Sequence, residues 1–194
     1  MRKIILASTS PRRKELLAKT GLKFSMVSSD YKEDMTLKLP PKELAEVLSM
    51  GKAEAVAKKY KDAIVIGADS FIAFHGHVLG KPHTSARAKT MLARLSGKVN
   101  DVVTGLSIID TKTGKHISRV FVCKIYLRKM TGREIDAYVR TGEPLDRAGG
   151  YDIHERGSVF VKKVEGDLFA AIGLPIYDLV SELRKFGVKA FDDR

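Results

Sequence analysis

The N-terminal segment combines several groups that bind phosphate. A strand-like apolar run is followed by a hydroxyl-rich turn and by a helix whose first turn is basic: Ser8, Thr9, Ser10, Pro11, Arg12, Arg13 and Lys14. Ser10 suits the N-cap and Pro11 suits the first helical position. Cations at this end of a helix oppose its dipole, at a cost of roughly 0.3–1 kcal/mol each. The segment therefore predicts a site for a polyanion, because free N–H groups and guanidinium groups favour phosphate; the alternative is a solvated basic turn.

A lysine interrupts an apolar stripe on the helix expected over residues 41–60. Leu44, Leu48, Val56 and Tyr60 lie four residues apart on one face, with Lys52 at the missing position. A lysine facing inward is disfavoured unless it is paired or its ammonium reaches the solvent. Lys52 either extends outward to water or reaches a phosphate or carboxylate in a cleft.

Asp69 and Ser70 come directly after the apolar run of residues 63–68. Ligand sites in α/β proteins lie at the carboxyl ends of strands. A carboxylate there can bind a divalent cation or accept a proton from water, whereas its structural alternative is to cap a turn. Ser70 either hydrogen-bonds a ligand or completes the turn.

Two further charged residues, Lys81 and Glu33, are candidates for binding a ligand or a metal ion. Lys81 lies between Gly80, which permits close approach of the backbone, and Pro82, which stiffens the chain; a surface turn is the alternative. Glu33 lies in an acidic segment with Asp30 and Asp34, and it is either a second metal-directed carboxylate or part of a solvated loop.

The segment 143–157 has little periodicity and is typical of a functional loop. Its acidic, basic and aromatic side chains could meet a base or a ribose: Asp146, Arg147, Tyr151, His154 and Glu155.

Composition limits the class of protein. The chain has 194 residues, of which 44% are hydrophobic and 30% charged, and this favours a single domain over residues 1–194. Cys123 is the single cysteine, so an internal disulfide is excluded, and a packed thiol is expected. With no apolar run of about 20 residues, we expect a cytoplasmic protein and no membrane partner. The net charge of +12 fits nucleic acid, an anionic substrate or a lysine-rich surface.

Strand-like and helical patterns alternate, which predicts an α/β fold. Strands are expected at residues 3–8, 24–29, 63–68, 102–110 and 116–126, and helices at 11–20, 41–60, 84–97, 131–142 and 175–187. Two hairpins are expected, one over residues 71–79 and one pairing 159–164 with 168–172.

Taken in order along almost the whole chain, these motifs resemble the Maf family of nucleoside triphosphate pyrophosphatases, relatives of the inosine triphosphatase group. The motifs that carry the resemblance are Ser8-Thr9-Ser10-Pro11-Arg12-Arg13, Lys52-Ala53, Gly67-Ala68-Asp69, Leu79-Gly80-Lys81-Pro82, Leu95-Ser96-Gly97, Thr104-Gly105, Gly142-Glu143-Pro144 with Asp146, Ala148-Gly149 and Gly173-Leu174-Pro175.

The resemblance implies a fold and a reaction. The fold would be an elongated mixed β-sheet flanked by helices, with two lobes around a central cleft. The reaction would be the hydrolysis of a nucleoside triphosphate to the monophosphate and pyrophosphate with Mg²⁺ or Mn²⁺. The resemblance also implies a homodimer. Fixed cations and a metal would stabilise the charge that develops on the phosphates.

The resemblance also implies roles for individual residues. Glu33 and Asp69 would address the metal, and Asp69 would also activate the attacking water. The substrate contacts would come from Ser8, Arg12, Arg13, Lys52, Ser70, Lys81 and His154.

Several positions depart from the family pattern, mostly in the part that would meet the base. The branch specific for dTTP and UTP carries Tyr-Gly-Ile-Gln-Gly where this chain has Tyr151-Asp152-Ile153-His154-Glu155, so His154 stands at the glutamine position. The other departures are Lys32, Asn100, Cys123 and Arg147. The substrate expected is therefore dTTP, UTP or a modified nucleotide. Two other functions are a non-enzymatic regulator of septum formation and a nucleic-acid-binding protein, the latter disfavoured because the basic residues are scattered.

Overall fold

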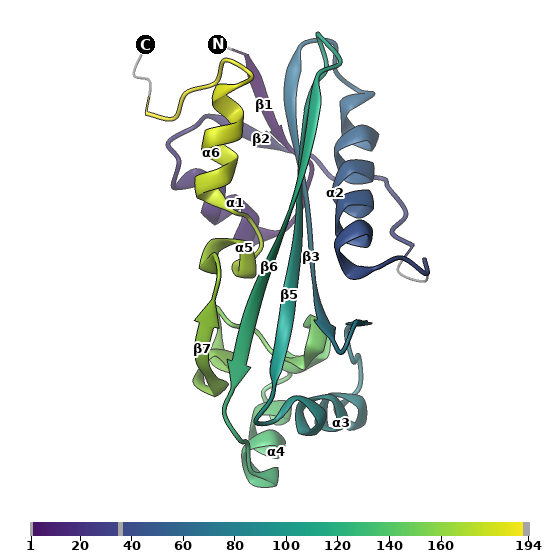
Figure 1. Cartoon of the computed structure of the whole chain (residues 1–194), viewed down its shortest axis with the longest axis vertical. Helices are drawn as coiled ribbons and strands as arrows, with labels where there is room; N and C mark the ends of the chain where they lie inside the picture. Colours follow the sequence, from purple (N-terminus) through teal and green to yellow (C-terminus); the bar gives the residue numbers. More distant parts are fainter. Residues whose placement is uncertain (1, 35–36, 192–194) are drawn as a thin grey trace. The chain divides into compact units, whose positions relative to one another are not determined.

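The computed structural model describes residues 2–34 and 37–191, which form a mixed sheet flanked by helices (Figure 1). Its strands follow the order β2-β1-β3-β5-β6-β7, and β4 pairs with β3. The strands are β1 (Lys3–Leu6), β2 (Phe24–Met26), β3 (Ala63–Phe74), β4 (His77–Leu79), β5 (Val99–Asp110), β6 (His116–Leu127) and β7 (Val161–Glu165). β1 is parallel to both β2 and β3, whereas the β3–β4 and β6–β7 pairs are antiparallel. The predicted mixed α/β sheet is thus confirmed.

Except for α5 (Leu168–Ile172), which the sequence predicts as a strand, the helices begin and end close to the residues that the sequence indicates. They are α1 (Pro11–Ala18), α2 (Pro41–Ala57), α3 (Ser85–Leu95), α4 (Gly132–Arg140), α5 (Leu168–Ile172) and α6 (Ile176–Arg184). Three 3₁₀ turns, at Glu143–Asp146, Ala148–Gly150 and Arg156–Phe160, make up most of the late loop. None of the helices in the described part of the chain is long and apolar enough to span a membrane.

The chain divides into two compact units. Unit 1 comprises residues 1–70, 104–121 and 173–194, and unit 2 comprises residues 71–103 and 122–172. Strands β3, β5 and β6 contribute residues to both units. The single domain and the central cleft expected from the sequence stay predictions.

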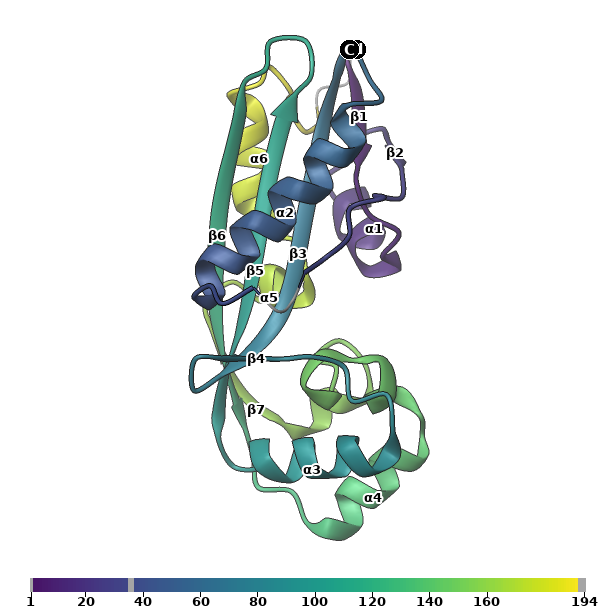
Figure 2. The ribbon, with the colours of Figure 1, turned by 90° about the vertical axis from the view of Figure 1, so that its right-hand side faces the viewer.

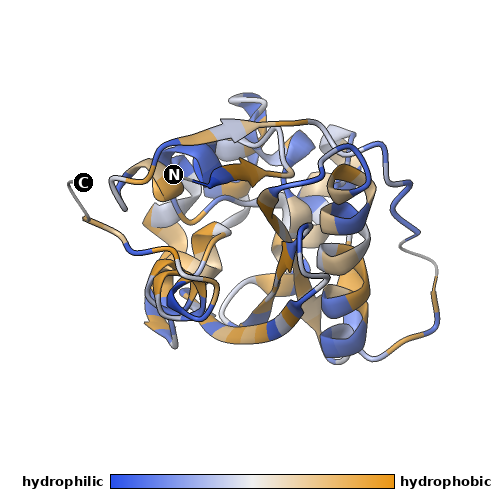
Figure 3. Cartoon of the chain, turned by 90° about the horizontal axis from the view of Figure 1, so that it is seen from above, coloured by the Kyte–Doolittle hydropathy of each residue, from blue (hydrophilic) through white to orange (hydrophobic). Residues whose placement is uncertain are grey.

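Unit 1 has helices on both faces of its strands. α2 covers one face, and α1 and α6 lie on the other (Figures 1 and 3). A core cluster joins β1 and β3 to α2 through side chains that are fully buried: Ile5, Ala7, Ala53, Val56, Ala63 and Val65. The stripe on α2 therefore faces the sheet, as predicted, and it brings Lys52 to that face.

Arg2 and Asp110 form an ion pair at the end of unit 1 where β1 begins and β5 ends. Arg2 Nη1 donates to Asp110 Oδ2 at 2.8 Å, and Arg2 Nη2 contacts the other carboxylate oxygen. Asp110 also accepts from the amides of Lys112 at 2.9 Å and Thr113 at 3.2 Å, which closes the β5–β6 turn. The hydrogen bonds from Arg2 hold the pKa of this buried carboxyl well below its ordinary value, despite the opposing effect of burial.

We expect Asp110→Asn to lower the free energy of unfolding at pH 7 by about 1.5 kcal/mol, because the charge-assisted bonds are lost. The depressed pKa means that the carboxylate stabilises the fold above about pH 4 and loses this effect as the pH falls through the folded-state pKa. Urea unfolding of both proteins at pH 7 and pH 3 measures the difference. An equal difference in the free energy of unfolding at both pH values would contradict the stabilising role of the Asp110 carboxylate.

Unit 2 packs α3 against α4 and the late loop (Figure 2). The sequence signals for both helix starts are confirmed. Thr84 accepts from the Arg87 amide at 3.3 Å, and Thr131 and Glu134 form the predicted capping box. The hairpin of β3 and β4 also forms as predicted, with positive φ at His75 and Gly76.

The second predicted hairpin is wrong. Residues 161–165 form β7, which pairs with β6, but residues 168–172 form the short helix α5. Asp167 begins this helix, since its side chain accepts from the Phe169 amide at 2.8 Å and its carbonyl accepts from the Ala171 amide at 3.0 Å. A short apolar run fits a strand or a helix equally well, and here the capping aspartate decides for the helix.

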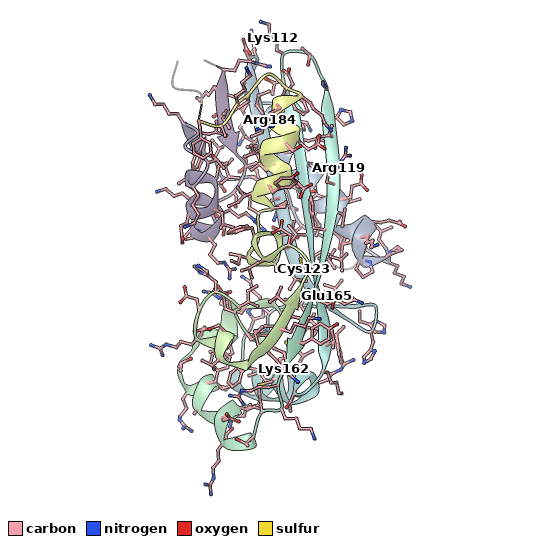
Figure 4. The ribbon with its side chains drawn as sticks, turned by 60° about the vertical axis from the view of Figure 1, so that its left-hand side comes forward. Lys112, Arg119, Cys123, Lys162, Glu165 and Arg184 are labelled. Atoms are coloured by element: carbon pink, nitrogen blue, oxygen red, sulfur yellow. The ribbon has the colours of Figure 1, made fainter. Side chains whose placement is uncertain are left out.

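Cys123 is a packed thiol, as expected. It lies on β6, next to the β7 residue Glu165 (Figure 4), and its Sγ contacts the Asp167 carbonyl at 2.9 Å. Burial raises its pKa, so the thiol is kept in its unreactive form.

Candidate active site

The start of α1 is marked by Pro11 and by the N-cap residue Ser10, whose side chain makes no capping bond among the described residues. Instead, Ser8 Oγ accepts from the Ser10 amide at 3.1 Å and so folds the turn between β1 and α1. The predicted helix start is confirmed, and the anion site there stays a prediction.

Arg13 ties this turn to two other segments of unit 1. Its Nε donates to the Gly173 carbonyl at 3.0 Å, and its two terminal nitrogens lie 3.4 Å from Ser8 Oγ and 3.3 Å from Ser70 Oγ. Desolvation lowers the pKa of Arg13, while the charge of Asp69 opposes this effect. The guanidinium remains a cation, because arginine does not deprotonate in proteins. Arg13 thus links the β1–α1 turn, strand β3 and the segment between α5 and α6 around one partly buried positive charge.

Lys52 meets two carboxylates in unit 1. Its Nζ forms an ion pair with Asp69 Oδ1 and lies 2.8 Å from Glu33 Oε1. The Lys52 side chain is only 12% exposed, so it does not extend to water, and the sequence alternative of a solvated ammonium is wrong. The Asp69 side chain is 8% exposed and that of Glu33 is 44% exposed. Helix α2, strand β3 and the acidic segment before α2 therefore converge at one cation.

Asp69 does not end its strand, in contrast to the sequence prediction. β3 continues through Asp69 to Phe74, although aspartate and serine are poor strand formers. The neighbouring strand β1 ends instead: Ala7 donates its amide to the Ile66 carbonyl at 2.8 Å, and the chain then turns at Ser8. Asp69 thus lies just beyond the carboxyl end of β1, a position at which α/β proteins commonly bind ligands.

Glycines let α2 approach the sheet closely enough for Lys52 to reach Asp69. A Cβ at Gly67 would lie 2.3 Å from the Ser49 carbonyl oxygen and 2.8 Å from Ala53 Cβ. A Cβ at Gly105 would lie 2.1 Å from the Ala45 carbonyl oxygen. Both contacts are with helix backbone, so only glycine permits this helix-to-sheet distance.

Tyr31 anchors the segment that carries Glu33. Its ring lies against Gly51 of α2, where a Cβ would come within 2.4 Å of the ring carbons. Because Glu33 is two residues away, this contact holds its carboxylate beside the helix turn that carries Lys52. Tyr31 and Gly51 could not be predicted from the sequence as residues that shape the site, since neither residue type signals chemistry on its own.

Unit 2 carries the remaining two predicted residues. Lys81 Nζ pairs with Asp146 Oδ1 at 2.7 Å, and this hydrogen bond lowers the pKa of the Asp146 carboxyl. His154 has an exposed side chain in the late loop. Both lie at the surface of the unit, with Lys81 49% exposed, and are accessible to a ligand.

Comparisons with known proteins show the family of this chain. A family model described as "Maf-like protein" matches residues 3–186. A dTTP/UTP pyrophosphatase of Methanosarcina barkeri is 45% identical over 194 residues, covering 100% of this chain and 98% of that protein. One of Bacillus cereus is 44% identical over 189 residues, with 97% of each chain covered. The chain belongs to the Maf family.

Among solved structures, the Staphylococcus aureus Ham1 protein has the same fold. It superposes with a TM-score of 0.53 at 13% sequence identity, covering 96% of this chain and 100% of that protein. At this identity the likeness concerns the fold alone. The mixed β-sheet flanked by helices that the Maf resemblance implies is thereby confirmed.

Two residues of the Maf motifs, Thr104 and Gly173, contact site residues in a way that was not predicted from the sequence. Thr104 Oγ1 donates to Ser70 Oγ at 2.9 Å, and the Gly173 carbonyl accepts a hydrogen bond from Arg13 Nε. Both positions belong to the motif series Thr104-Gly105 and Gly173-Leu174-Pro175, which was the available signal. Their roles depend on contacts between segments far apart in the chain, which spacing along the sequence does not reveal.

Proposed function

We propose that this nucleotide pyrophosphatase of the Maf family hydrolyses dTTP and UTP to the monophosphate and pyrophosphate. The observation that carries the proposal is the arrangement in unit 1, where a basic helix start and Arg13 accompany the Lys52–Asp69–Glu33 cluster. The names of relatives that are 44–45% identical over nearly their whole length support the substrate class.

In the proposed mechanism, Asp69 acts as the base and the cations hold the phosphates. The buried carboxylate of Asp69 orients a water molecule and accepts its proton as the water attacks the α-phosphorus. Ser8, Arg12, Arg13 and Lys52 of unit 1 hold the phosphate chain, and Lys81 stays a predicted substrate contact. These fixed charges stabilise the negative charge that grows on the departing pyrophosphate, which is the main source of rate enhancement in such a site.

A divalent cation fits the same residues. Asp69 and Glu33 already direct their carboxylates at one positive group, the Lys52 ammonium, so the site is built to surround a cation. One or two carboxylates with substrate phosphates form a usual environment for Mg²⁺. We therefore assign Asp69 and Glu33 as the residues that would hold Mg²⁺ or Mn²⁺. The ion would neutralise phosphate charge and lower the pKa of bound water.

His154 is the proposed contact to the base. A neutral imidazole has one donor and one acceptor nitrogen, and uracil and thymine present an N–H donor beside carbonyl acceptors. Ser70 is a proposed substrate contact in unit 1, because its hydroxyl lies beside Arg13. A cytoplasmic location follows from the proposed substrates, which are intermediates of nucleotide metabolism.

The test is product analysis in ¹⁸O-labelled water with dTTP, UTP, CTP and GTP. We expect pyrophosphate release from dTTP and UTP, with the label in the monophosphate, because attack occurs at the α-phosphorus. EDTA should stop the reaction, and added Mg²⁺ or Mn²⁺ should restore it. Release of orthophosphate, or label in the pyrophosphate, would contradict the proposed reaction.

The two other functions and the homodimer stay predictions. Nucleic-acid binding would weaken steeply with salt and would tolerate the loss of Asp69, because phosphate contacts dominate such affinity. The hydrolase requires Asp69, so the Asp69→Asn variant separates these two functions.

A further inference from the structure

We propose that Asp152 is a positioning residue that sets the nucleotide preference by fixing the backbone at His154. This inference rests on the proposed function, in which His154 meets the base. Asp152 Oδ1 accepts from the His154 amide at 2.9 Å, and Asp152 itself is only 3% exposed. The carboxylate thus lies beneath the loop whose tip carries the exposed imidazole.

A buried carboxylate requires compensation, and Arg147 supplies it. Arg147 Nε lies 2.7 Å from Asp152 Oδ2, the oxygen that does not face His154. An unpaired charge at such a buried position is costly, so the ion pair allows the carboxylate to remain inside the unit. Asp152 Oδ2 therefore pairs with Arg147, while Asp152 Oδ1 accepts the hydrogen bond from the His154 amide.

The loop on both sides of His154 is fixed independently. Before it, Tyr151 Oη donates to Asn100 Oδ1 at 2.8 Å. After it, Glu143 Oε1 accepts from the Gly157 amide at 3.0 Å and from Tyr138 Oη at 2.6 Å. Between these anchors, the Asp152 side chain is the contact that reaches the His154 backbone. Loss of this contact frees the segment carrying His154 while the anchors remain.

The experiment compares the ratio of kcat/KM for UTP to kcat/KM for CTP in variants of the full chain. Asp152→Ala should lower the ratio about tenfold, mostly through a higher KM for UTP, because the hydrogen bond that orients His154 is lost. Asp152→Asn keeps an acceptor oxygen of the same reach and should stay within about twofold of the native ratio. Asp136→Ala is the control, since it removes another ion-paired aspartate of unit 2, with a side chain 48% exposed.

A double variant tests whether Asp152 acts through His154. In a His154→Ala background, Asp152→Ala should cause no further change in the ratio. Hydrogen exchange adds a readout without substrate: the His154 amide should lose protection in Asp152→Ala and retain it in Asp152→Asn.

The outcomes separate this inference from the proposed function. If the native protein hydrolyses neither UTP nor dTTP, the proposed function fails and this inference fails with it. If the native protein prefers UTP and Asp152→Ala is equally selective, only the role of Asp152 is overturned. An additive effect in the His154→Ala background, or a tenfold loss in folded Asp152→Asn, overturns it as well.

Discussion

Replacing Asp69 with asparagine is expected to lower kcat for pyrophosphate release by about 10²–10⁴-fold, because the amide cannot accept the proton of the attacking water. The substitution preserves size and leaves an oxygen that can still contact Lys52. Steady-state release of pyrophosphate from dTTP measures kcat. Binding of a non-hydrolysable α,β-methylene analogue should remain detectable, because the cations that hold the phosphates are unchanged.

Asp62→Asn is the matched control for this experiment. Asp62 also belongs to unit 1 and pairs with Arg2 at 3.0 Å, but its side chain is 53% exposed. We expect native kcat in this variant. An Asp69→Asn protein that retains kcat within tenfold of the native value would remove Asp69 from the role of base.

Replacing Gly67 with alanine is expected to affect both stability and activity. The added methyl group would overlap the Ser49 carbonyl and Ala53, so α2 must move away from the sheet. We expect a loss of about 1–3 kcal/mol in the free energy of unfolding. Because Lys52 moves with α2, kcat/KM should also fall, by up to about 10²-fold for a displacement near 1 Å. Urea unfolding and the pyrophosphate assay measure the two effects.

Gly132→Ala is the control for the glycine substitution. Gly132 begins α4, and a Cβ at this position would have no neighbour within 4 Å among the described residues. Stability and activity should therefore stay close to native values. Native stability in Gly67→Ala would show that α2 adjusts freely, and it would contradict the close-packing argument.

The sequence was most informative where local chemistry decides the structure. Pro11 marked a helix start, Thr131 with Glu134 marked another, and the stripe on α2 faced the core. In each case the signal and the structure lie within a few residues of each other. The packed state of Cys123 followed in the same way from the apolar run around it. Residues 168–172 were the exception, because five apolar residues carry no period that separates strand from helix.

The sequence predicted which residues belong to the candidate site, but it did not predict the contacts that those residues make with one another. The residue types and the Maf resemblance named Arg13, Lys52 and Asp69 before any contact was known. The resemblance also led to the fold class and the pyrophosphatase class, which the relatives support. The individual roles of these residues, the metal and the homodimer stay predictions.

The sequence by itself determined which chemical groups this protein has and where most of its helices and strands begin. Only the tertiary structure decided that Arg13 binds Gly173, that Lys52 is shared by Asp69 and Glu33, and that Asp152 supports His154. The physical reason is that these contacts join residues on separate segments, or depend on burial. Both properties arise only when α2 packs on the sheet and the late loop folds around the buried carboxylate of Asp152.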